Sequence, residues 1–329
     1  MRRELKQAVN PLEELLIIIK QYFSKLVNWI DNLTDNRNQS YITYDFKICL
    51  LTQILALCSS YQSMNKIGRD FNSDIVINNI NHILKTNYLE LPHKDTLINI
   101  ISSMKFDDLE KIQTNIIRTL IRSKMFDKYK FNGLFHIVIN GTGLYSTHVN
   151  LGEQAITKVY NKGQDNEYTL YSYYVLEAKL VCGNITFSLA TEFVENETYT
   201  DDKGNSYRKF DKQDCELKAA YRLLKKIKKR FPKLPIIIGG DAMYLGRPFL
   251  ELCDELKFDY IIRYKENGAP SIKRNFDEIK ISENNYEYQN EIIFGYLKDN
   301  KFYTLNFISY DEKDIDDEAG ETIKKTFLM

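Results

Sequence analysis

Two polar residues that could bind a metal ion follow apolar, strand-like runs in this sequence. Asn140 follows the run 135–139, and Asp241 follows the run 234–239 and one further glycine. Oxygen ligands at the ends of neighbouring strands hold the divalent ions of phosphodiester chemistry. The separation, 241 − 140 = 101 residues, leaves room for three intervening elements. The two positions therefore predict one metal site. At this site Asn140 offers a single neutral oxygen, whereas a carboxylate would offer two charged oxygens.

Each residue also has a plainer interpretation. Asn140 followed by Gly141 is a common hairpin signal, which predicts a tight turn between strands near 135–139 and 144–149. Asp241 is a residue type that caps helices, although it lies four or five residues before the helix expected at 246–257. His136 lies within the apolar run and is interpreted as a core histidine.

Clustered cations provide candidate contacts for DNA phosphates. Arg263 and Lys265 alternate along an expected strand and would project from one face of it. Lys66, Arg69 and Lys94 lie in the helical region, where a plain surface role is an equal alternative. The remaining candidates share one helix, for which a solvated face is the competing interpretation: Lys225, Lys226, Lys228, Lys229 and Arg230.

Composition limits the class of protein. The 329 residues carry 45 basic and 45 acidic side chains, so any nucleic-acid surface must be local. The hydrophobic fraction of 43% supports a substantial core, and five cysteines without a CxxC pair fit reduced thiols in a cytoplasmic protein. The apolar run 15–19 is too short to span a membrane, and no signal peptide precedes it.

The hydrophobic pattern changes from helical to strand-like near residue 130. The first part predicts helices within 12–33, 44–60, 63–72, 94–104 and 107–126. The second predicts strands near 134–140, 168–181, 185–194, 234–239 and 259–264, with helices at 212–231 and 246–257. This order is typical of a mixed α/β sheet with helices on both faces. A small β insertion is expected at 284–309, and an acidic loop at 311–321.

An ordered set of short motifs resembles the DDE transposases of bacterial insertion sequences, of the IS-four type. The matching stretches run from about 60 to 275: SMNKIGRDFN, LPHKDTLINIIS, INGTGLYS, VLEAKLV, ATEFVEN, KQDCELKA, FPKLPIIIGGDAMY and FDYIIRYKENGAPSI.

The resemblance implies a domain plan, a cofactor and a partner. It implies a helical region (1–130) that binds DNA ends, a ribonuclease-H-like core (131–283), and a β insertion with an acidic tail (284–329). In a core of this kind the first and fourth strands are neighbours, so their ends can share an ion. It further implies Mg²⁺ or Mn²⁺ as cofactor, transposon-end DNA as partner and a homodimer as the assembly.

Two departures from the family pattern bear on activity. The family has aspartate at the position of Asn140, and it places a glutamate beside a tryptophan on a helix well past Asp241. Only 329 − 241 = 88 residues follow Asp241, and the single tryptophan is Trp29. The expectation is a truncated chain without the third acid, with Mg²⁺ binding weak or lost and no catalysis. Three other glutamates match family contexts outside the catalytic triad: Glu192, Glu195 and Glu216.

Two alternatives remain open at this stage. A non-catalytic DNA-binding protein could compete for transposon ends, or the chain could be an α/β protein with neither activity.

Overall fold

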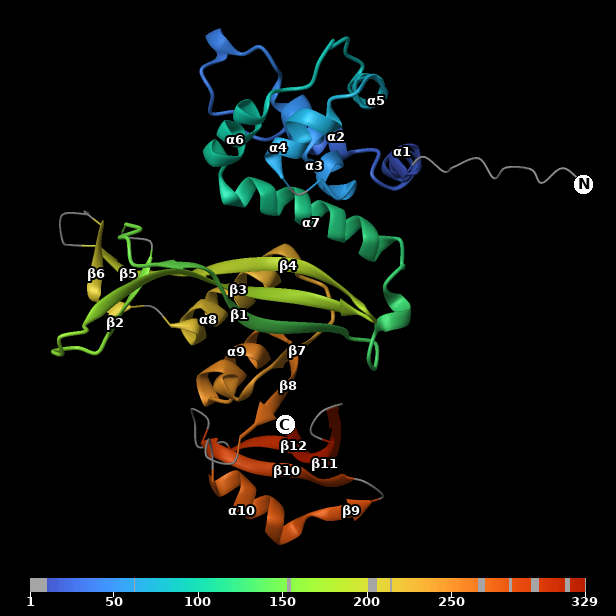
Figure 1. Cartoon of the computed structure of the whole chain (residues 1–329). Coiled ribbons are helices and arrows are strands. Elements are labelled where there is room, and N and C mark those ends of the chain that lie inside the picture. Colours follow the sequence, from blue (N-terminus) through green and yellow to red (C-terminus); the bar gives the residue numbers. More distant parts are fainter. Residues whose placement is uncertain are drawn as a thin grey trace, which may run out of the picture. The chain divides into compact units, whose positions relative to one another are not determined.

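The computed structural model divides the chain into two compact units, Met1–Met125 and Phe126–Met329 (Figure 1). The described residues are 11–61, 63–152, 155–200, 206–213, 215–265, 270–283, 286–296, 302–316 and 320–328. The boundary expected at 283/284 stays a prediction.

The first unit is built from helices packed around α3 (Phe46–Cys58). Apolar residues surround this helix on most sides, so its neighbours α2, α5 and α6 bury it, with Ile48, Leu51 and Leu55 fully enclosed. The predicted helical N-terminal region is confirmed. Its other elements are α1 (Pro11–Tyr22), α2 (Leu26–Asp31), η1 (Gln39–Tyr41), α4 (Met64–Lys66), the π-helical turn η2 (Ile67–Phe71), α5 (Asp74–Leu84), α6 (Lys94–Ser103) and α7 (Phe106–Arg122).

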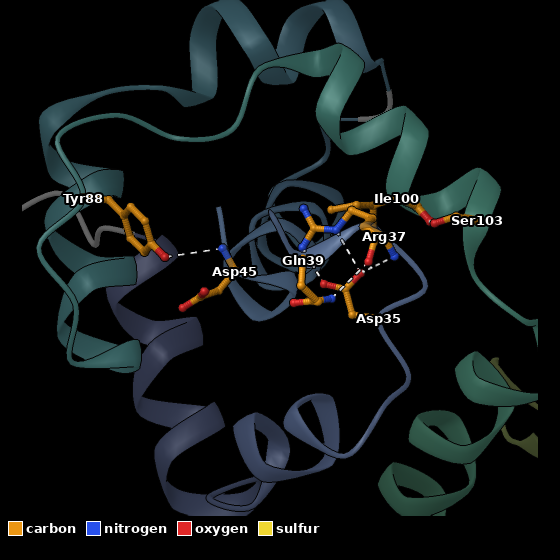
Figure 2. A network of polar contacts seen from close by, with 7 residues as sticks. All are labelled: Asp35, Arg37, Gln39, Asp45, Tyr88, Ile100 and Ser103. Carbon is orange, nitrogen blue, oxygen red and sulfur yellow. Dashed lines mark hydrogen bonds and ion pairs between the residues drawn. The ribbon is translucent and has the colours of Figure 1, made fainter. Parts of the chain in front are cut away.

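A polar network fixes the segment that leads into α3 (Figure 2). The Arg37 guanidinium donates to both carboxylate oxygens of Asp35, at 2.9 and 2.8 Å, and this contact lowers the pKa of Asp35. Asn36 donates to the Ser103 carbonyl of α6 at 3.2 Å. These bonds hold in place a connection that has little helix of its own.

The second unit contains a mixed sheet, and the predicted mixed α/β class is confirmed. Five of its strands run in the order β2-β3-β1-β7-β8, and β4 pairs with β3 along the same edge as β2 (Figure 1). Strands β1, β7 and β8 are parallel, while β3 is antiparallel to β1, β2 and β4. The bounds are β1 (Phe135–Thr147), β2 (Ile156–Tyr160), β3 (Tyr168–Cys182), β4 (Ile185–Val194), β7 (Ile236–Gly240) and β8 (Asp259–Tyr264). The first and fourth predicted strands, expected to be neighbours, are β1 and β7. These two strands pair in the structure, so this prediction is confirmed.

Two amphipathic helices cover one face of these strands. α8 (Glu216–Arg230) packs on β3 and β4, and α9 (Arg247–Leu256) packs on α8 and β8. Leu223, Leu224 and Ile227 of α8 are fully buried. This face is therefore the hydrophobic core of the second unit.

Of the remaining described strands, four extend this sheet beyond β8 and two form a separate pair. β12 (Gly320–Leu328) joins β8 to an antiparallel group with β11 (Phe302–Asp316), β10 (Tyr286–Tyr296) and β9 (Ile281–Glu283), and α10 (Pro270–Ile279) packs on β10. β5 (Asn196–Thr200) pairs with β6 (Ser206–Gln213). The 3₁₀ turns η3 (Asp127–Tyr129) and η4 (Ala242–Tyr244) complete the described elements.

One alternative interpretation and one expectation from the sequence were wrong. β1 does not end in a turn at Asn140; it continues to Thr147, because the backbone beyond Asn140 pairs with β3. Residues 311–316 are not loop: β11 continues to Asp316, and its register pairs Asp311 with Lys325 of β12. In both places a pairing with a distant segment overrides the local signal.

Candidate functional site

Asn140 of β1 and Asp241, which directly follows the parallel neighbour β7, lie at the same level. The register pairs Val138 of β1 with Gly239 of β7, and both polar residues lie two positions further on. Parallel strands are roughly 4.8 Å apart, so the two positions are within reach of one ion. Both side chains are exposed.

Strand alternation directs both side chains to the same face of the sheet. A Cβ atom on Gly239 would lie 2.7 Å from His136 Nε2 and 3.4 Å from Val138 Cγ2, so these positions share a face. Asp241 has extended backbone angles, φ −79° and ψ 177°, and therefore continues the alternation. His136 is half-buried, and burial lowers its pKa, as expected for a core histidine.

Asp241 also has a structural role. Its Oδ1 accepts from the Met243 amide at 2.9 Å and caps η4, the turn that follows β7. The alternative interpretation of Asp241 as a cap is right about the contact but not about the helix, because the three-residue turn η4 lies between Asp241 and α9. One carboxylate oxygen is therefore already engaged by the backbone.

Two further charged residues lie level with this pair. Glu177 of β3 is paired directly with Asn140, and its Oε2 lies 3.2 Å from Lys179 Nζ. Gly239 is paired with Ile261 of β8, so Arg263 lies level with Asp241. Sequence reasoning missed Glu177. An acid within the largely apolar stretch VLEAKLV is a signal, but only the antiparallel register shows that it faces Asn140.

These donors do not fit a two-ion centre. Asp241 and Asn140 supply hard oxygens, which suit magnesium, but only one of them is charged. Across the described parts of the chain, no group of three or more His, Cys, Asp or Glu side chains is placed to hold a metal. The donor set is at most that of a single, weakly held ion.

Gly141 allows a close approach on the opposite face of β1. A Cβ atom there would lie 2.5 Å from Glu216 Oε2 and 2.7 Å from Tyr174 Cε1. Glu216, in the first turn of α8, accepts a 2.5 Å hydrogen bond from the hydroxyl of the buried Tyr244. Burial, and then this bond, raises the pKa of Tyr244. The glycine after Asn140 is therefore explained by packing and not by a turn.

We expect Gly141→Ala to destabilise the second unit by about 1–3 kcal/mol, because the added methyl group overlaps Glu216 and Tyr174. The measurement is the free energy of unfolding in urea. Gly143→Ala is the matched control in the same strand, since its Cβ atom would meet Tyr174 at an ordinary 3.7 Å. Equal effects of the two substitutions would contradict this account of Gly141.

The cations predicted to bind DNA differ in their surroundings. Lys225 and Lys229 of α8 are exposed and lie one helical turn apart. Lys226 instead contacts Glu192 Oε2 at 2.7 Å and donates to the Thr191 carbonyl, so it anchors α8 to β4. Lys228 is partly buried and lies over the Phe258 ring. Arg230 and Arg263 are also partly buried, and Lys265 is exposed.

In the first unit, three predicted cations lie in or near α4, η2 and α6. Lys66 is exposed, Lys94 donates to the Asn65 side chain at 2.8 Å, and Arg69 forms an ion pair with Asp70. The Asp70 carboxylate reduces the local positive charge of Arg69.

Comparison with known proteins assigns this chain to no family. No family model and no curated protein matches this sequence. No helix in the described parts of the chain has the length and apolar character needed to cross a membrane. Among solved structures, the chain is similar to a piggyBac transposase in a synaptic complex with hairpin DNA, with a TM-score of 0.34 and 11% identity. The match covers 98% of this chain and 61% of that one, so this chain spans less than two thirds of its length. A similarity of this size carries no argument about function.

Proposed function

We propose that this chain is a transposase-type DNA-binding protein of the IS-four kind that does not cut or join DNA. One observation carries the proposal: the register of β1 and β7 brings Asn140 level with Asp241 on one face of the sheet. A turn residue has no reason to lie there, whereas the first acid of a ribonuclease-H-like site does. The motif resemblance described above supports the same proposal.

The neutral side chain of Asn140 is the reason for proposing loss of catalysis. Two-ion phosphoryl transfer needs several carboxylates to hold both ions close together. Asp241 is the one acid of this pair, and its carboxylate also caps the following turn. Under this proposal, DNA binding persists because it depends on cations elsewhere on the surface.

Residual DNA binding should fall steeply with salt, because phosphate contacts release counterions. We expect Lys225→Gln with Lys229→Gln to weaken binding of a DNA duplex and to reduce the salt slope by roughly two, at about 0.9 for each lost contact. Fluorescence anisotropy between about 50 and 200 mM salt, in the presence of EDTA, measures both quantities.

Lys158→Gln with Lys162→Gln is the control, since it removes the same charge from β2 and the following turn. An equal loss in this control variant would show that net charge, and not the α8 surface, governs binding. A flat response to salt in the unmodified chain would contradict DNA binding through phosphates. It would favour the alternative of an α/β protein with neither activity.

A further inference from the structure

Glu216 and Tyr244 form a contact directly behind the Asn140–Asp241 pair. Tyr244 is 1% exposed, and its hydroxyl donates to Glu216 Oε1 at 2.5 Å. Tyr244 ends the turn that Asp241 caps, while Glu216 belongs to the first turn of α8. The bond therefore ties the Asp241 turn to the helix that covers the opposite face of the sheet.

A glycine on each of the two strands lets the backbone lie close to the Glu216–Tyr244 pair. Gly141 places the β1 backbone against the Glu216 carboxylate, as described above. Gly240 does the same on β7, where an added Cβ atom would lie 2.7 Å from Tyr244 Cδ2. The ends of both strands thus rest on one hydrogen-bonded pair of side chains.

We propose that Glu216 and Tyr244 are positioning residues for the Asn140–Asp241 site. They hold the Asp241 turn level with β1 and do not contact an ion themselves. The proposal rests on the proposed function, because it assigns them to that site. Glu216 lies beside Gly141, and successive residues of a strand point to opposite faces of the sheet. Glu216 is therefore on the face opposite to Asn140, which supports a positioning role and not a role as a metal ligand.

Manganese binding to a charge-restored site tests this assignment. In an Asn140→Asp background, Tyr244→Phe and Glu216→Ala should each weaken Mn²⁺ binding about tenfold or more, the scale on which residues that orient ligands act. Glu216→Gln should keep most of the affinity, because its amide oxygen still accepts the Tyr244 hydroxyl. If Glu216→Gln loses as much Mn²⁺ affinity as Glu216→Ala, the charge of Glu216 acts on the ion directly and the positioning role is overturned.

Glu192→Gln is the matched control for a general loosening of α8. Glu192 anchors the same helix through Arg222 and Lys226, at 2.8 and 2.7 Å, but it lies on β4, which β3 and β1 separate from β7 and the Asp241 turn. Its substitution should leave Mn²⁺ affinity unchanged. A loss equal to that of Tyr244→Phe would overturn the proposal.

Amide exchange separates this inference from the proposed function. Without Asn140→Asp and without metal, Tyr244→Phe should speed hydrogen exchange of the Met243 amide, which donates to Asp241, while Glu192→Gln should not. If Asn140→Asp binds no Mn²⁺ but Met243 exchange responds in this way, the proposed function fails and the positioning contact stands. Unchanged Met243 exchange in Tyr244→Phe overturns the contact itself.

Discussion

We expect the purified chain to show no nicking or joining of DNA with Mg²⁺ or Mn²⁺. The physical reason is ligand charge: Asn140 contributes one neutral oxygen where two-ion chemistry needs a carboxylate. The measurement is conversion of supercoiled plasmid to open circles over several hours, with both metals, beside an authentic metal-dependent nuclease.

Asp241→Ala controls for a contaminating nuclease, because trace activity that persists in this variant cannot arise at the site. Robust metal-dependent nicking that disappears in Asp241→Ala would refute the proposed loss of catalysis. It would also mean that the carboxylates near the strand ends, such as Glu177, supply what Asn140 does not.

The second large effect is expected from Asn140→Asp. This change restores a charged ligand beside Asp241, and sites for hard cations are tuned over orders of magnitude by ligand charge and rigidity. We expect Mn²⁺ or Mg²⁺ affinity to rise by about tenfold or more, measured by calorimetry. DNA strand transfer should stay absent, because no third acid is grouped with this pair among the residues that the structure describes.

Asn166→Asp is the control for a charge added elsewhere. Asn166 is exposed in the turn between β2 and β3 and adds the same charge away from the strand ends. Equal gains in the two variants would show that the added charge attracts metal without a shared site. No gain in Asn140→Asp would refute the interpretation of residue 140 as a former ligand.

The sequence was sufficient to predict much of the scaffold around the site. The apolar runs at 135–139 and 234–239 lie largely within β1 and β7, because central parallel strands that are buried or partly buried on both faces read as near-continuous apolar runs. Helical spacing at 212–231 likewise identifies α8, although the helix begins at Glu216. That β1 and β7 are neighbours was predicted from the resemblance to a ribonuclease-H-like sheet, whose first and fourth strands lie side by side.

The rest of the site depends on contacts between distant segments. Gly141 resembles a turn glycine, and its real constraint, the Glu216 carboxylate, lies 75 residues further along the chain (216 − 141 = 75). Glu177 faces Asn140 only through the antiparallel register of β3. A one-residue slip would move Glu177 to the opposite face, so local pattern alone cannot assign it.

Lys226 shows the same limit for surface charges. In sequence it is one of several cations on a basic helix, with nothing to distinguish it from Lys225. In the structure it pairs with Glu192 of β4. The partner strand decides which cations of α8 face solvent.

A double-mutant cycle on Mn²⁺ binding tests the central claim, that Asn140 and Asp241 share one ion site. Asp241→Asn removes the charge but keeps a good capping residue for η4, so the turn is preserved. The cycle compares the gain from Asn140→Asp with Asp241 present and with asparagine there instead. We predict that the gain largely disappears in the Asp241→Asn background, as two ligands of one ion require. An undiminished gain, additive within error, would contradict a shared site and with it the proposed relationship to metal-dependent transposases.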